Sequence, residues 1–245
     1  MKKVLLLILL VIISFSYNSP AATPVGPIRI LVITGGHDFK FGPFEQMLAS
    51  LGSNIQYQIV EFPAAFDMFL PENQNKYDVL VFYHMWQEIS KEQEDVLASC
   101  IRQGKPLVVL HHSICAFDDW PEYTNIIGGK YFHKTASING KDYPESSYIH
   151  DIHFMVRIAD RKNPVTKNIP DFEIFDETYK GFYVEDGVTP LLMTDEPSST
   201  PIIGWSKTYG KARVVTLQSG HDVPTFENPN FRKLLIQSIE WVCNK

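Results

Sequence analysis

Histidines follow apolar runs at four places in this chain. They are His37, His84, the pair His111 and His112, and His221. Runs of this kind are typical of buried strands, and in an open parallel sheet the ligand site lies beyond the carboxyl ends of the strands. If the runs are neighbouring strands, five of the eight histidines gather along one edge. Imidazole titrates near neutral pH and ligates metals, so the pattern predicts a site of chemistry or ligand binding. The alternative is that each histidine caps a strand and hydrogen-bonds to nearby backbone.

The segment Leu110–Ser113 stands where a strand turns into the following segment. In hydrolase-like α/β folds such a turn presents a reacting side chain above the sheet. Here the tip residue is a histidine, which can act as a general base, a metal ligand or a hydrogen-bond donor. Ser113 is near enough in sequence to share the site, whereas Cys115 comes too late to be the tip. We expect one of the two histidines, His111 or His112, to pack below the turn.

A glycine turn, Gly35-Gly36, precedes His37 and Asp38. Glycines there let the backbone turn tightly and approach a ligand. The spacing lacks the features of a dinucleotide or phosphate loop, so a plain tight turn is the alternative. We take His37 and Asp38 as candidate substrate contacts.

An acidic pair, Asp176 and Glu177, follows a short apolar run. A carboxylate near imidazoles raises their basicity or completes a metal site, whereas an isolated acidic pair is more often a solvated strand end. Aromatic residues also fall in expected loops near these positions, and flat rings in a polar cleft suit sugar faces, although most loop aromatics are merely half-buried. These aromatic residues are Trp86, Trp120, Tyr179 and Tyr183. His133 follows a glycine pair, and His150 and His153 lie on a half-exposed strand, where we expect both at the surface.

Strand and helix signals alternate through the first half of the chain. The expected strands are 28–34, 55–62, 79–83 and 107–110, and the expected helices contain residues 44–51 and 90–103. Ser90 and Gln93 form a capping-box start, and Gly104 is a helix stop. This alternation predicts a flavodoxin-like, three-layer α/β fold with a mainly parallel sheet.

The middle of the chain, about residues 130–190, is polar and rich in Tyr, Asp and Ser. Residues 152–158 alternate between apolar and polar, which predicts a half-exposed strand. We expect this segment to form a polar side lobe or lid laid beside the sheet within one domain. Short strands at 191–193, 202–205 and 213–218 then follow, and Asn228-Pro229 opens a last helix.

The first 22 residues have the layout of a secretory signal peptide. Lys2 and Lys3 are followed by the apolar run 4–13 and by small residues at 19–22. We therefore expect an exported protein, periplasmic or secreted, whose single mature domain is 23–245. The alternative, an uncleaved anchor, needs roughly 20 apolar residues. No later apolar run is long enough to predict a membrane span.

Removing Lys2 and Lys3 leaves 20 basic and 28 acidic residues without a basic cluster, so nucleic acid is not an expected partner. Cys100, Cys115 and Cys243 match no zinc spacing and no small disulfide scaffold.

Taken together, these segments resemble the ThuA-like family of trehalose-utilisation proteins over nearly the whole mature chain. The landmarks are Thr34–Phe39, Val109–Ser113, Ile127–His133, Asp176–Tyr179, Gly204-Trp205 with Tyr209–Val214, and Gln218–Asp222. The resemblance implies a fold related to class I glutamine amidotransferases, with histidine where those enzymes carry the nucleophilic cysteine. It also implies a place in the catabolism of disaccharides, including 3-keto sugars. Many members have His-Pro where this chain has Asn163-Pro164.

Three functions are compatible with these residues. The first is an enzyme acting on a disaccharide or keto-sugar by hydrolysis, elimination or isomerisation. Its acid and base would be His111 or His112 with His221, and Glu177 would orient one imidazole. Its substrate contacts would be His37, Asp38, His84, Trp86, Ser113, His133 and Tyr179. No cofactor is certain, but a variant places a divalent metal among His111, His133, Glu177 and His221.

The second function is a non-catalytic carbohydrate-binding protein on a degenerate amidotransferase fold. It would bind sugar through Trp86, Trp120 and Tyr179. The third is a true glutamine amidotransferase or Cys hydrolase, which we disfavour because thiolate chemistry needs a cysteine at the tip of the turn.

Overall fold

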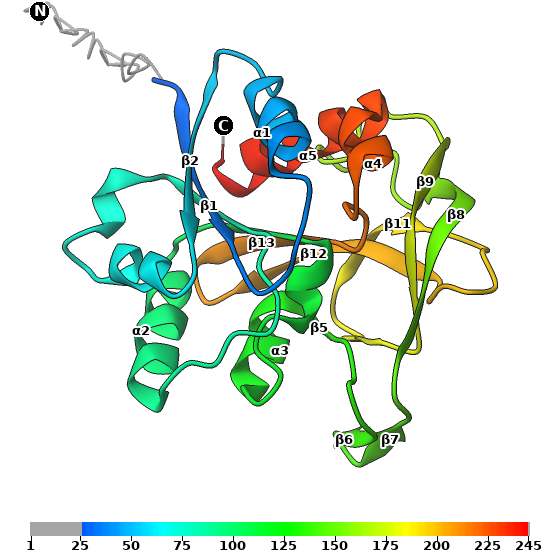
Figure 1. The fold of residues 1–245 in the computed structure, drawn as a ribbon, viewed down its shortest axis with the longest axis horizontal. Helices are drawn as coiled ribbons and strands as arrows, with labels where there is room; N and C mark the ends of the chain where they lie inside the picture. The colour runs from blue at the N-terminus through cyan, green and yellow to red at the C-terminus, as the bar shows by residue number, and fades with distance from the viewer. Residues whose placement is uncertain (1–25, 245) are drawn as a thin grey trace, which may run out of the picture.

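The computed structural model describes residues 26–244, so the expected signal peptide lies outside the described residues. Figure 1 shows a long sheet crossing the molecule with helices above and below it. The strands are β1 (Ile28–Thr34), β2 (Ile55–Glu61), β3 (Val79–Phe82), β4 (Leu107–Leu110), β5 (Gly129–Lys130), β6 (Ala136–Ile138), β7 (Lys141–Tyr143), β8 (Ser147–Ile158), β9 (Phe172–Lys180), β10 (Tyr183–Val184), β11 (Thr189–Met193), β12 (Ile202–Tyr209) and β13 (Ala212–Leu217). The helices are α1 (Phe41–Ala49), α2 (Lys91–Arg102), α3 (Pro121–Ile127), α4 (Val223–Glu227) and α5 (Pro229–Val242), with 3-10 turns at Ala64–Phe69, Gln74–Lys76 and His111–Cys115.

The main sheet has the order β2-β1-β3-β4-β13-β12-β11-β8-β9. All pairings from β2 to β13 are parallel, and all pairings from β13 to β9 are antiparallel. The parallel half is the one that the alternating strand and helix signals predict. The other half is antiparallel because its strands follow one another without a helical crossover.

The sheet separates two apolar cores, which gives the expected three layers. One core lies under α1 and α5 and contains Phe44, Leu234 and Val32, and the other lies under α2 and α3 and contains Leu97, Ile126 and Ile33. Because helices cover both faces, the central strands β3 and β4 are buried at every position. No helix within residues 26–244 has both the length and the apolar character to cross a membrane.

Local sequence signals set the helix ends. The capping box at α2 is present, since the Ser90 side chain accepts from the Gln93 backbone N–H and the Gln93 side chain accepts from the Ser90 N–H. The Asn228 side chain caps α5 by accepting from the backbone N–H groups of Asn230 and Phe231.

The polar middle segment contributes directly to the sheet. Strands β8 and β9 pair along most of their length and extend the sheet at one end, while β6 and β7 form a small hairpin that projects from it (Figure 1). In β8, Phe154, Val156 and Ile158 are buried in alternation, as expected. The pairing register shifts between Ile149 and Ile152, where Asp151 has a φ of 60°.

Candidate active site

The two histidines at the expected turn sit directly after β4, at the carboxyl edge of the parallel strands. His111 has a φ of 47° and its side chain is fully buried. A non-glycine residue in the left-handed region marks a sharp, constrained turn, and such strain concentrates at functional sites. His221 follows β13, whose residues pair with β4, so the chain brings His111 and His221 side by side.

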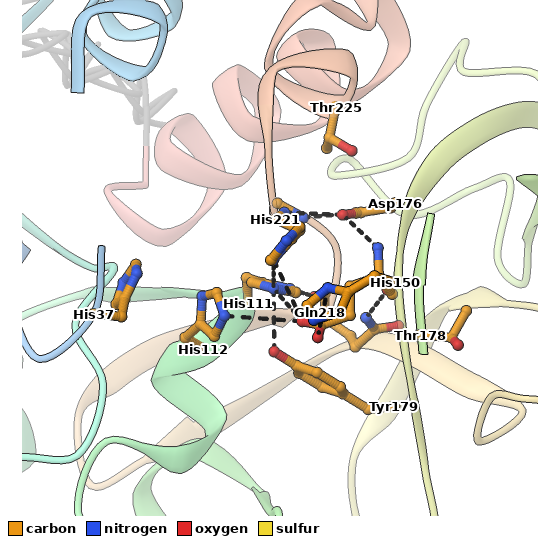
Figure 2. Close-up of polar contacts among 12 residues, drawn as sticks. His37, His111, His112, His150, Asp176, Thr178, Tyr179, Gln218, His221 and Thr225 are labelled. Carbon is orange, nitrogen blue, oxygen red and sulfur yellow. Dashed lines mark hydrogen bonds and ion pairs between the residues drawn. The ribbon is translucent and has the colours of Figure 1, made fainter. Parts of the chain in front are cut away.

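Three side chains, those of His111, His221 and Glu177, converge at this turn. His111 and Glu177 are buried and His221 is 28% exposed; Figure 2 labels the two histidines. His111 Nε2 lies 3.2 Å from His221 Nδ1 and 2.9 Å from the Oε2 oxygen of Glu177. The same Glu177 oxygen is 3.4 Å from His221 Nδ1. The histidines come from the two parallel strands and the glutamate from β9, so the antiparallel half of the sheet supplies the only carboxylate of this triangle.

The backbone partner of His111 shows which of its ring nitrogens carries the proton. His111 Nδ1 is 2.6 Å from the Gln218 carbonyl oxygen. A carbonyl only accepts, so Nδ1–H is the donor and Nε2 is the atom that faces Glu177 and His221. The Tyr179 hydroxyl, 3.1 Å away, also faces Nε2. Both ring nitrogens of His111 are therefore engaged within the protein.

His112 and His37 form a second layer beside the triangle. His112 Nε2 is 3.8 Å from Glu177 Oε2, while its Nδ1 is buried and without a hydrogen-bond partner. The His37 ring lies 4.4 Å from that of His112, and His37 Nε2 is held by the Tyr83 carbonyl oxygen at 3.0 Å. Burial, reinforced by neighbouring imidazoles of which His111 is the strongest, lowers the pKa of His112 well below its usual value. His112 is therefore neutral at pH 7.

The Glu177 carboxylate lies within 4 Å of four histidine side chains. Its side chain is 3% exposed. Burial alone would raise the pKa of this carboxyl, but the contact and charge of His111, with the charge of His221, outweigh burial and lower it. His221 has a lowered pKa because of burial and the repulsion of His111, which exceed the attraction of Glu177. A carboxylate with a lowered pKa thus sits beside His112 and His221, whose pKa values are also lowered.

Asp176, next to Glu177, holds the backbone of the turn after β13. Its two carboxylate oxygens accept from the backbone N–H groups of Gly220 and His221 at 2.8 and 2.9 Å. Gln218 adds a bond from its side-chain amide to the Glu177 carbonyl oxygen at 2.8 Å. These bonds fix the His221 backbone relative to β9, so they set the spacing between His221 and Glu177.

A pocket of about 240 Å³ opens beside the triangle. Its lining residues are Met85, Trp86, His112, Cys115, Tyr131, His133, Glu145, Tyr148, His150, Glu177 and Tyr179. His112 and Glu177 present the polar groups of its inner end. This volume is small for a ligand pocket, which typically measures ~300–1,000 Å³.

His150 lies at the surface, as expected, and also lines this pocket. Its side chain is half-exposed, and its Nδ1 lies 3.2 Å from Glu177 Oε1. The register shift beside Asp151 breaks the two-residue alternation and turns His150 toward β9. His153, further along the same strand, also lies at the surface and pairs with Glu173.

Several of the other expected contacts lie elsewhere. His84 is completely buried on the opposite face, between the rings of Phe62, Phe82 and Phe117. Ser113 is buried and its hydroxyl donates to the His84 carbonyl oxygen.

At the near edge, Asp38 is exposed and does not line the pocket. Among the aromatic residues, Trp120 is 4% exposed and packs in the core, and Tyr183 pairs with β5. Trp86, His133 and Tyr179 do line the pocket, and the Trp86 indole N–H donates to His133 Nε2 at 2.7 Å. His133 is thereby kept apart from the triangle.

Within the described residues, one cluster has the composition of a metal site. His111, His112, His221 and Glu177 each offer a ligand atom, and these atoms lie within 4.8 Å of one another. Tetrahedral zinc ligands at 2.0–2.1 Å would be about 3.3 Å apart, close to the observed 2.9, 3.2 and 3.4 Å. Glu177 Oε2 also accepts no hydrogen bond. His112 thus takes the place that the sequence-based variant gave to His133.

Comparison with known proteins defines the family. Residues 29–242 match the family model ThuA, described as trehalose utilisation. The chain belongs to the ThuA family. A ThuA-like protein from Parabacteroides merdae shares 18% identity with this ThuA-family chain, covers 89% of it and 90% of its own length, and superposes with a TM-score of 0.72. A ThuA-like protein from Bacteroides uniformis has 18% identity, coverages of 91% and 94%, and a TM-score of 0.68.

More distant structures extend the same fold. PurLQS from Thermotoga maritima matches this ThuA-family chain with 13% identity, 88% coverage of this chain, 99% of its own, and a TM-score of 0.55. These likenesses confirm the expected α/β fold of the glutamine amidotransferase type, with a mixed central sheet. No curated protein matches the chain.

Proposed function

We propose that this ThuA-family protein is an exported enzyme of saccharide breakdown that acts on a disaccharide or its 3-keto derivative. The observation that carries the proposal is the triangle of His111, His221 and Glu177, of which His111 and Glu177 are buried, beside a small pocket. Burying ionisable groups costs free energy, and a fold does not need a histidine and a glutamate buried in contact for its stability. Such clusters are characteristic of sites where protons or metal ions are handled.

Both ring nitrogens of His111 contact protein groups, so His111 positions its neighbours and does not contact the substrate. Nδ1 donates to Gln218 and Nε2 faces Glu177, so His111 has no free nitrogen to offer a substrate. His112 and His150 border the pocket instead. His112 is neutral at pH 7 and can take a proton from a sugar hydroxyl or from a carbon next to a keto group.

Glu177 orients His150. The carboxylate faces Nδ1 of His150 at 3.2 Å and favours the tautomer with the proton on that nitrogen. Nε2 of His150 is then free to accept a proton in the pocket. This arrangement of a buried carboxylate behind an imidazole is the same one that activates the base of hydrolytic triads. His150 and His112 therefore serve as the pair that moves protons.

The same residues fit a divalent metal. His111, His112, His221 and Glu177 would hold the ion, which when bound supplies a Lewis acid for a carbonyl or hydroxyl oxygen of the substrate. In that state His150 stays outside the ligand set and keeps its proton-transfer role. Asp176 and Gln218 would orient two of the ligands through the backbone, as outer partners commonly do.

Turnover by single variants tests the assignment. The protein without a His tag would be offered trehalose, maltose, sucrose, cellobiose and lactose with their 3-keto forms, and its metal content measured. We expect His112→Ala and His150→Ala each to lower kcat by ~10²–10⁴-fold. His153→Ala is the matched control on the same strand and should stay within about twofold of wild type.

The test for a bound metal ion uses the variant Glu177→Gln. If an ion is bound stoichiometrically, this variant and His221→Ala should lose it, since each removes one ligand. Full turnover in His112→Ala and His150→Ala would contradict the proposal. Sugar binding by the wild-type protein without any turnover would instead assign it as a carbohydrate-binding protein.

A further inference from the structure

Two exposed aromatic side chains stand at the mouth of the active-site pocket. Trp86 is 57% exposed and Tyr148 is 56% exposed, and both line the pocket that contains His112 and Glu177. They come from different walls, since Trp86 follows β3 and Tyr148 lies on β8. Large apolar side chains left open to solvent at a pocket mouth mark a binding surface.

Trp86 is held in its exposed position. Its backbone has a φ of 45°, which is an unfavourable conformation for a bulky residue. Its indole N–H donates to His133 Nε2 at 2.7 Å, and the two rings meet edge to face with centroids 5.3 Å apart. Strain of this kind persists where the surroundings over-determine it and is concentrated at ligand clamps.

Tyr148 is linked to the reacting groups on the other wall. Its ring lies 5.2 Å from that of His150, the side chain that contacts Glu177. In the ladder between β8 and β9, Tyr148 pairs with Tyr179, whose hydroxyl faces His111. The ladder therefore fixes the Tyr148 backbone relative to the triangle of His111, His221 and Glu177.

The inner pocket is too small for a whole disaccharide. Its volume is about 240 Å³, and two of its lining residues, His112 and Glu177, carry buried polar atoms without a hydrogen-bond partner. A second hollow of about 380 Å³ begins on the other side of Trp86, where Gln87, Glu88 and Asp119 offer polar groups. A ligand that fills the inner pocket and continues outward must pass Trp86.

We propose that Trp86 and Tyr148 form a subsite for the second sugar ring, while the reacting ring occupies the inner pocket. The apolar face of a pyranose would pack on the exposed rings, as flat amphipathic side chains favour. This inference rests on the proposed function and makes it more specific, because it requires a substrate of at least two rings. Glucose would then bind weakly by comparison with trehalose.

Ligand protection of Trp86 tests the subsite. The chain has four tryptophans, of which Trp120 and Trp205 are buried and Trp241 is half-buried. Trp86 therefore dominates fluorescence that acrylamide can quench. In wild type, disaccharides or 3-keto disaccharides that bind should protect Trp86 fluorescence from quenching by acrylamide. In Trp86→Phe this ligand-protected fluorescence should be absent.

The energetic test compares two-ring and one-ring ligands by calorimetry. Trp86→Ala and Tyr148→Ala should each weaken the disaccharide by roughly tenfold or more and leave the matching monosaccharide within about twofold. Phe41→Ala is the control, since Phe41 is 49% exposed and lies outside the pocket. Thermal melting of every variant confirms that it is folded.

The outcomes separate the two proposals. If His112→Ala abolishes turnover but the aromatic variants bind both ligand sizes as wild type does, the subsite is refuted and the proposed function stands. An equal loss for one-ring and two-ring ligands also refutes it, because the aromatic pair would then contact the reacting ring. If no saccharide of the panel binds wild type, both proposals are wrong.

Discussion

His84 should control the acid stability of this protein and have no part in its chemistry. The imidazole is completely buried among Phe62, Phe82 and Phe117, and neither ring nitrogen has a hydrogen-bond partner. Burial, with a smaller contribution from the charge of His37, lowers the pKa of His84 from 6.5 to about 3. The perturbation we consider is His84→Phe, which replaces the imidazole by a ring that cannot take up a proton.

The sign and size of the effect follow from proton linkage. Below pH 6.5 the unfolded chain protonates this histidine while the folded protein does not, so the folded state loses stability as the pH falls from 6.5 toward 3. A pH of 5 is about 1.5 units below the ordinary histidine pKa of 6.5. At this pH the unprotonated His84 therefore lowers the free energy of unfolding by about 2 kcal/mol. His84→Phe removes this contribution and leaves the other titrating groups unchanged.

Urea denaturation at pH 7 and pH 5 measures the contribution of His84 to the free energy of unfolding. Wild type should lose about 2 kcal/mol more free energy of unfolding between these pH values than His84→Phe does. Any packing cost of the larger ring cancels, because it is present at both pH values. Saccharide affinity at pH 7 should be unchanged. Equal pH dependence in the two proteins would show that His84 is not buried in the neutral form, and a loss of saccharide affinity would return it to the site.

Two further substitutions test the turn around the site. A Cβ at Gly36, where φ is 80°, would lie 1.6 Å from the Met85 carbonyl oxygen, so Gly36→Ala should destabilise the protein by ~3 kcal/mol or more. Gly42→Ala is the control, since nothing lies within 4 Å of its Cβ; in thermal melts it should leave stability unchanged or raise it by up to ~1 kcal/mol. Cys115→Ala should keep turnover within about twofold, because burial raises the pKa of this thiol well above its usual value and leaves no thiolate. A hundredfold loss in a folded Cys115→Ala protein would restore a cysteine mechanism.

Much of the site follows from where the strands end. His111, His112 and His221 meet because β4 and β13 are neighbours and both carry histidine at the carboxyl end. The acidic pair after residue 175 also has the expected contact with the histidines. The sequence predicts these features because strand ends are visible in the pattern of apolar runs.

Other placements depend on facts that the sequence does not display. The strand β3 is buried on both faces, so its pattern does not reveal that Phe82 and His84 point to one core while Tyr83 points to the other. Likewise, regular alternation places His150 on the same face of β8 as Ile152 and Phe154, and the register shift near Asp151 brings it to Glu177. Both cases require knowledge of tertiary pairing that a single strand cannot supply.

The bonds that assemble the triangle connect distant parts of the chain. The contacts of His111 with Gln218 and His221 span 107 and 110 positions, and those of Asp176 with the turn span 44 and 45. Loop-closure entropy must be overcome before any of these contacts adds stability. A chain that has emerged only as far as residue 217 lacks Gln218 and His221, so the triangle cannot form during most of synthesis.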